Sequence, residues 1–129
     1  MPTYRKETIL VVDDAEAIRK MVCAVLSQNG YSCVEASNGH EALLRLNDEV
    51  VQLVLTDVVM PGMGGPELAS RLARERPEVR IMFMSGYSED PVVHTVQRVP
   101  TLFLEKPFTT GALMSKIRQA LDEPWEGLA

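Results

Sequence analysis

The chain of 129 residues has the length of one domain, and its composition, 46% hydrophobic and 24% charged, is that of an ordinary globular protein. A net charge of −5 argues against a general nucleic-acid-binding surface, which needs clusters of basic side chains. No apolar run approaches the roughly 18 residues of a membrane span, and the first residues, MPTYRKE, lack the apolar core of a signal peptide, so we expect a cytoplasmic, reduced protein.

The first half of the chain alternates short apolar runs with amphipathic segments. Residues 8–12 are an apolar, β-branched run that is too short for a helix core, which predicts a buried strand. Residues 15–28 predict a helix that stops at Asn29-Gly30. Residues 31–36 predict a second strand, and residues 39–47 a second helix. The inward face of the first helix is expected to carry apolar side chains at helical spacing, namely Ile18, Met21, Val22, Val25 and Leu26.

The alternation continues through the middle of the chain. Residues 52–56 predict a third strand that ends on Asp57, and residues 61–65 predict a loop. A helix over residues 66–76 follows, because a proline fits its first turn and another proline blocks its continuation. Residues 79–84 predict a fourth strand.

The last third contains the segment least favourable to a helix. Residues 88–99 predict a short or irregular helix, with His94 exposed on it rather than acting as a ligand. Residues 101–105 predict a fifth strand. Thr109 can cap a last helix that ends at residues 122–124, which leaves Trp125 as a partly exposed tail residue or one packed on that helix.

The two cysteines, Cys23 and Cys33, do not have the spacing of a metal-binding or redox motif. Because we expect a reducing compartment, we interpret both as small buried hydrophobic residues rather than as disulfide partners.

Apolar strands that alternate with amphipathic helices indicate an α/β fold, with a parallel sheet covered by helices on both faces. Right-handed crossovers then bring the carboxyl ends of all strands to one edge, where such sheets bind ligands. The residues that follow the predicted strands are Asp13 and Asp14, Asp57, Ser85, and Lys106. Each alone is most often a turn former, a helix cap or a solvated loop residue. Together they predict a single polar site.

Three carboxylates in one place repel each other, and a divalent cation removes that conflict. Oxygen ligands without cysteine or histidine favour Mg²⁺ over zinc. A carboxylate beside Mg²⁺ and an ammonium group can act as the nucleophile in phosphoryl transfer and form an aspartyl phosphate. The glycines of the chain match neither a P-loop nor a dinucleotide-binding fingerprint, so the phosphoryl donor must arrive already activated.

The segments ILVVDD, LVLTDVVMPGMGG, IMFMSGY and FLEKPF resemble those of response-regulator receiver domains of two-component signalling, either single-domain receivers or receivers of hybrid histidine kinases. The resemblance extends from about residue 8 to residue 121 and implies one receiver domain over residues 1–129. It implies a flavodoxin-like doubly wound sheet with strand order 2-1-3-4-5. It also implies that a histidine kinase or a histidine phosphotransfer domain is the phosphoryl donor.

By this resemblance, Asp57 accepts the phosphoryl group. Asp14, Asp57 and the backbone carbonyl of Val59 would bind Mg²⁺ directly, and Asp13 through water. Lys106 and Ser85 would contact the phosphoryl oxygens, and the Lys106–Pro107 peptide bond would be cis, which a proline permits.

The resemblance also suggests how the phosphoryl group is sensed and lost. Ser85 and Phe103 occupy the switch positions, although Phe103 lacks the hydroxyl of the tyrosine often found there and is equally explained as a core residue. Val59 and Tyr87 flank the path of the hydrolytic water in the family. Because valine cannot orient a water and tyrosine can shield the site, we expect slow self-dephosphorylation.

The expected activity is that of a signalling domain which catalyses only its own phosphorylation and dephosphorylation. Two alternatives remain: a degenerate receiver that docks partners without phosphorylation, and a phosphohydrolase that uses an aspartyl phosphate. The phosphohydrolase is disfavoured because Val59 stands where a second acid is needed. Few residues follow the last helix, so we expect a stand-alone receiver or a domain of a hybrid kinase, with an unidentified downstream partner.

Overall fold

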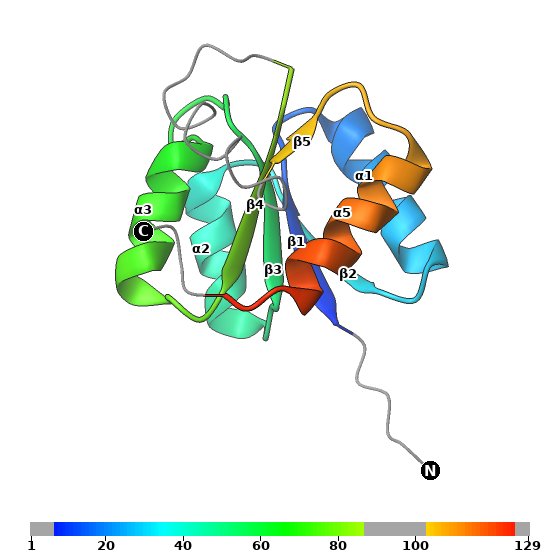
Figure 1. Ribbon diagram of the computed structural model, residues 1–129. Helices are drawn as coiled ribbons and strands as arrows, with labels where there is room; N and C mark the ends of the chain where they lie inside the picture. The colour runs from blue at the N-terminus through cyan, green and yellow to red at the C-terminus, as the bar shows by residue number, and fades with distance from the viewer. Residues whose placement is uncertain (1–6, 87–102, 126–129) are drawn as a thin grey trace.

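The computed structural model describes residues 7–86 and 103–125. A five-stranded sheet, in the order β2-β1-β3-β4-β5, forms its centre (Figure 1). Every neighbouring pair of strands is parallel. This confirms the predicted α/β fold and its strand order. The strands are β1 (Thr8–Val12), β2 (Ser32–Ala36), β3 (Leu53–Asp57), β4 (Arg80–Ser85) and β5 (Phe103–Glu105).

Helices cover both faces of this sheet. Figure 1 shows α2 and α3 on one face and α1 and α5 on the other. The described helices are α1 (Glu16–Gln28), α2 (Gly39–Asp48), α3 (Gly65–Glu75) and α5 (Thr110–Asp122). The helix expected over residues 88–99, with His94, lies outside the described residues. Within the described part, no helix is both long and apolar enough to cross a membrane.

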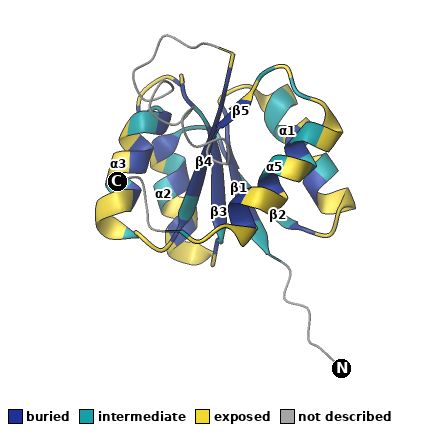
Figure 2. Cartoon of the chain, viewed as in Figure 1, coloured by how far each residue is buried: buried dark blue, intermediate teal, exposed yellow. Residues whose placement is uncertain are grey.

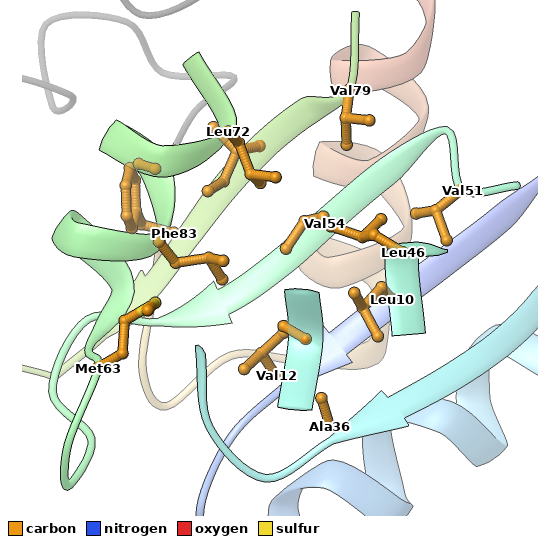
Figure 3. Packing of buried hydrophobic residues seen from close by; sticks show 14 of the residues in the cluster. Leu10, Val12, Ala36, Leu46, Val51, Val54, Met63, Leu72, Val79 and Phe83 are labelled. Carbon is orange, nitrogen blue, oxygen red and sulfur yellow. The ribbon is translucent and has the colours of Figure 1, made fainter. Parts of the chain in front are cut away.

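Alternation along the strands divides the hydrophobic core into two layers. In β1, Leu10 and Val12 point toward α2 and α3, whereas Ile9 and Val11 point toward α1 and α5. Figure 2 shows the sheet as the most deeply buried part of the chain. Figure 3 shows the packing of the core layer between the sheet and helices α2 and α3. Because the central strands are buried on both faces, they read as continuous apolar runs in the sequence.

Local capping explains where two helices begin. The side chain of Asn38 accepts a hydrogen bond of 2.9 Å from the backbone N–H of Glu41 at the start of α2. Thr109 Oγ1 accepts one of 3.0 Å from the N–H of Ala112, which confirms the predicted cap of α5. Each satisfies a backbone donor that the first helical turn leaves unpaired.

Two sequence interpretations are wrong. Met21 was expected on the inward face of α1, but its side chain is 44% exposed, and Cys23 is buried instead. The face that packs on the sheet is therefore rotated toward Cys23. Cys23 and Cys33 are not free thiols: α1 packs against β2 and brings their Cα atoms to 5.7 Å, and the sulfur atoms are joined in a disulfide.

The chain after α5 lies against the opposite helical layer. Trp125 is partly buried, as expected, but its ring packs against the core layer between the sheet and α2 and α3, and not on α5. Its neighbours there include Leu72 and Val79, and its indole N–H donates a 3.0 Å hydrogen bond to the carbonyl of Pro77. The residues after α5 therefore connect the two layers at the amino-terminal edge of the sheet.

Candidate functional site

The carboxyl-terminal edge of the sheet brings the predicted site residues together. Asp13 follows β1, Asp57 ends β3, Ser85 ends β4, and Lys106 follows β5. Asp14 adjoins Asp13 at the entrance to α1. Parallel strands place these residues at one edge although up to 93 positions separate Asp13 from Lys106 in sequence.

Three carboxylates form the centre of the site. Asp13, Asp14 and Asp57 each offer an oxygen atom, and these atoms all lie within 4.8 Å of one another. Asp13 is completely buried, the side chain of Asp57 is 14% exposed, and Asp14 is exposed. The site is therefore open on the side of Asp14 and closed behind Asp13.

Lys106 supplies a positive charge at this acidic centre. Its Nζ donates a 3.0 Å hydrogen bond to Asp13 Oδ2 and lies 3.4 Å from Asp57 Oδ2. The Lys106 side chain is 24% exposed. Its backbone N–H donates to the carbonyl of Ser85, which fixes the loop after β5 against the end of β4. Lys106 thus bridges two acids that would otherwise repel each other.

Burial of Asp57 raises its pKa above the usual range for an aspartate. The nearby charge of Lys106 opposes this effect, and the charge of Asp13 adds to it. The Val58 N–H donates a 2.9 Å hydrogen bond to Asp57 Oδ1, which also favours the ionised form. Oδ1 is thus held by the backbone, whereas Oδ2 faces the lysine.

The loop after β3 is held in position by short-range contacts. Thr56 Oγ1 donates to the carbonyl of Asp57 at 2.9 Å, and the N–H of Gly65 donates to the carbonyl of Val58 at 3.0 Å. Gly62 has a φ of +75°, a left-handed conformation that favours glycine. The chain can therefore turn between the end of β3 and the start of α3, which places Gly65, the first residue of α3, beside Asp57.

The remaining predicted residues have different surroundings. Ser85 is 1% exposed at the end of β4, and Phe103 is 8% exposed within the core layer of α2 and α3. Val59 is 57% exposed, two residues after Asp57. Tyr87 lies outside the described residues. The Lys106–Pro107 peptide bond is cis, as the resemblance implied.

Sequence reasoning missed one contributor, Arg19 in α1. Its Nη1 donates a 2.8 Å hydrogen bond to the carbonyl of Asp13, and its Nε donates to Glu35 Oε1 at 2.9 Å. The only sequence signal was an arginine five residues after Asp14 in the first turns of a helix. That spacing alone does not show that the side chain returns to the strand end.

The donor set fits a hard divalent cation. The acidic centre presents only carboxylate oxygens, and one of its acids, Asp13, is fully buried. A buried carboxylate needs a compensating charge, and Lys106 supplies one positive charge for three acids. Oxygen ligands at partial exposure are those that Mg²⁺ binds while keeping part of its water shell.

Comparison with known proteins agrees with this geometry. Residues 9–118 match the family described as the response regulator receiver domain. The chain belongs to this family. It is therefore a receiver domain of two-component signalling, and receiver domains generally bind Mg²⁺ and pair with histidine kinases.

Relatives of this receiver include proteins of very different length. It is 35% identical to the sensor kinase CckA of Brucella abortus, covering 90% of this chain and 13% of the kinase. It is 34% identical to the response regulator receiver protein CpdR of the same organism, covering 88% of this chain and 95% of CpdR. The chain thus spans a small part of the kinase and nearly all of the single-domain relative.

Solved structures show the same architecture. A CheY-like response regulator receiver domain protein from Methanospirillum hungatei superposes with a TM-score of 0.79 at 28% identity, over 92% of this chain and 95% of the other. The five-stranded receiver fold is therefore shared across proteins of low sequence identity.

Proposed function

We propose that this receiver accepts a phosphoryl group on Asp57 from a phosphohistidine of a histidine kinase or a histidine phosphotransfer domain, with Mg²⁺ as cofactor. The observation that carries the proposal is the position of the Asp57 carboxylate, which faces the Lys106 ammonium at 3.4 Å beside a second, fully buried acid. We propose one domain over residues 1–129 with its core at about 8–121, acting in the cytoplasm.

In the transfer, an oxygen of Asp57 attacks phosphorus and the phosphorus–nitrogen bond to the donor imidazole breaks. The electron pair of that bond stays on the imidazole nitrogen, which takes up a proton. Mg²⁺, when held by Asp14, Asp57 and the Val59 carbonyl, and by Asp13 through water, would neutralise charge on the transferring group. Lys106 stabilises the same charge from the other side, and the Ser85 hydroxyl contacts a phosphoryl oxygen.

The buried position of Asp13 gives it a supporting role in this proposal. Its Oδ2 accepts the hydrogen bond from Lys106, and its Oδ1 accepts one of 2.9 Å from the N–H of Ala15. Both carboxylate oxygens are thus oriented by the protein. Asp13 therefore holds Lys106 close to Asp57 before the donor arrives.

The charge on phosphorylated Asp57 would be sensed through Ser85 and transmitted to the face around β4 and β5. Phe103 is the candidate for the second switch residue, and its burial in the core means that any ring movement must displace packed neighbours. The domain catalyses only its own phosphorylation and dephosphorylation, and its downstream partner is a protein that recognises the altered face.

Incubation with acetyl phosphate and Mg²⁺, followed by intact mass spectrometry, tests the proposal. We expect the mass of one phosphoryl group on the wild type and none on Asp57→Asn or in the presence of a chelator. Asp48→Asn, which changes an exposed acid at the end of α2, is the matched control and should be labelled like the wild type. No adduct on the folded wild type would instead favour a docking module that works without phosphorylation.

Val59 offers a test of the phosphoryl lifetime. Its exposed side chain beside Asp57 cannot orient the hydrolytic water, and Tyr87 is proposed to shield the same path. Loss of the phosphoryl group from the purified phosphorylated protein should therefore be slower for the wild type than for Val59→Asn. Equal decay rates would show that Val59 does not slow the loss of the phosphoryl group.

A further inference from the structure

A covalent link joins α1 to the edge strand of the sheet. Cys23 of α1 and Cys33 of β2 are bonded, with Cα atoms 5.7 Å apart, a separation that disulfides commonly have. They are the two cysteines of the chain. Cys23 is 8% exposed and Cys33 is half-buried on the outermost strand, so Cys33 is the more accessible of the two.

An ionic link runs beside the covalent one. Glu35 accepts hydrogen bonds of 2.9 Å from Arg19 and 3.1 Å from Lys20. Arg19 lies four residues before Cys23 in the helix, and Glu35 lies two residues after Cys33 in the strand, so both links occupy the same faces of α1 and β2. The disulfide therefore holds α1 and β2 at the separation that the ion pairs need.

The ionic link changes the titration of Glu35. Partial burial alone would raise the pKa of Glu35, but the hydrogen bonds and charges of Lys20 and Arg19 outweigh burial and hold this pKa below its ordinary value. The side chain of Arg19 is only 14% exposed, so the pair is less screened by solvent than a surface pair.

The same arginine leads to the acidic centre. Arg19 Nη1 donates to the carbonyl of Asp13 at 2.8 Å, and the N–H of Asp13 donates to the carbonyl of Ala36, the residue after Glu35, at 3.1 Å. Both backbone groups of Asp13 are thus bonded to α1 or β2. A change in the packing of α1 on β2 therefore alters the hydrogen bonds of the Asp13 backbone, and Asp13 is the acid that orients Lys106.

We propose that Cys23 and Cys33 form a reversible thiol–disulfide site, and that oxidation of this site strengthens Mg²⁺ binding at the acidic centre through Arg19 and Glu35. Any effect of oxidation on the phosphorylation of Asp57 rests on the function proposed above. The thiol chemistry of the pair and its effect on Mg²⁺ binding do not. Arg19 is a positioning residue in this scheme, since it acts through the Asp13 backbone.

A low-molecular-weight disulfide such as oxidised glutathione is the oxidant. The Cys33 thiolate attacks one of its sulfur atoms, and the first glutathione thiolate leaves. The Cys23 thiolate then attacks the Cys33 sulfur of the mixed disulfide and releases the second. Two protein thiols lose two electrons and two protons, and one glutathione disulfide becomes two glutathione thiols.

The first experiment measures the redox equilibrium. The full chain is incubated in buffers of reduced and oxidised glutathione, quenched with acid, and alkylated with a bulky maleimide that reports each free thiol by a mobility shift. We expect the pair to pass from two free thiols to none as the ratio changes. A pair that stays reduced in every buffer, or oxidised in every buffer, would overturn the proposal.

The second experiment measures Mg²⁺ affinity of the fully oxidised and fully reduced chain by titration calorimetry. Loss of a supporting contact behind a metal ligand weakens metal binding by roughly 10- to 100-fold. Because the disulfide reaches that contact only through the ion pair of Arg19 and Glu35, we expect oxidation to tighten Mg²⁺ binding by about 3- to 10-fold. Equal affinities in the two states would overturn the coupling.

Two variants separate the steps. The double variant Cys23→Ala with Cys33→Val, which keeps apolar side chains, should bind Mg²⁺ independently of redox state. Arg19→Gln should still titrate with glutathione, but its Mg²⁺ affinity should no longer respond to oxidation. If Arg19→Gln keeps the full response, the coupling does not pass through Arg19 and this path is wrong. A wild type that shows the redox effect on Mg²⁺ yet takes no phosphoryl group would refute only the proposed function.

Discussion

Substituting Gly65 with alanine tests how closely the loop after β3 is packed against Asp57. A Cβ atom at this position would lie 2.5 Å from the carbonyl oxygen of Asp57 and 3.1 Å from the Cα of Val58. The first distance is about 0.9 Å short of the 3.4 Å at which ordinary contact begins. These two obstacles are backbone atoms, and the ring of Phe83 lies 3.2 Å away as a third. The substitution must therefore move either α3 or the acceptor residue itself.

The size of the effect follows from these contacts. Overpacking of this kind costs about 1–3 kcal/mol, and weakening the Gly65 N–H bond to Val58 adds up to about 1 kcal/mol. Alanine has a higher helix propensity than glycine, which offsets about 0.5–1 kcal/mol of this destabilisation. We therefore expect Gly65→Ala to lower the free energy of unfolding by about 1–3 kcal/mol. Displacing the acceptor by part of an ångström should slow phosphorylation by roughly tenfold or more.

Gly111→Ala is the matched control. The nearest atom to a Cβ there is Thr109 Oγ1 at 3.9 Å, and the residue is exposed in the first turn of α5. This variant should be stabilised by about 0.5 kcal/mol and phosphorylated at the wild-type rate. Urea denaturation followed by circular dichroism, and acetyl phosphate labelling over time, give both quantities. Equal gains in stability for the two variants, with unchanged labelling, would refute the packing argument.

Three further predictions concern stability. Trp125→Phe keeps the ring in its apolar contact but removes the hydrogen bond to Pro77, so urea denaturation should show a loss of about 1 kcal/mol; no loss would mean that the bond is dispensable. Reducing the disulfide, which spans 10 residues, should cost about 3 kcal/mol, and an unchanged midpoint in reductant would contradict this. Because Arg19 and Lys20 lower the pKa of Glu35 in the folded state, its stabilisation is present above its ordinary value of 4.5 and is lost as pH falls through the lowered pKa. The difference in unfolding free energy between wild type and Glu35→Gln should therefore disappear in acid; a difference that grows in acid would show the opposite sign.

The parts of the fold that depend on local pattern could be predicted from the sequence. β1 begins and ends where its apolar run does, and the ends of β2, β3 and β4 differ from the prediction by at most one residue. β5 ends at Glu105 as predicted, and the first two residues of its predicted range lie outside the described residues. β1, β3, β4 and β5 each end at or next to a polar residue of the candidate site, so Asp57, Ser85 and Lys106 could be placed at one edge from alternation and handedness alone.

The parts that depend on contacts between distant segments could not. The pairing of Cys23 with Cys33 follows from the packing of α1 on β2 and not from cysteine spacing. Trp125 packs beside α3 because the chain after α5 crosses the edge of the sheet. The contact of Arg19 with the Asp13 carbonyl likewise needs the angle between a helix and a strand. None of these relations has a periodic signal in the sequence.

The most direct test of the central claim locates the phosphoryl group. The wild type is labelled with acetyl phosphate and Mg²⁺ and reduced with borohydride, which converts an aspartyl phosphate to homoserine, and its peptides are then sequenced by mass spectrometry. The account predicts homoserine at position 57 alone and none when Mg²⁺ is chelated. Modification at Asp13 or Asp14 with Asp57 intact, or no modification of a folded protein that binds Mg²⁺, would contradict it.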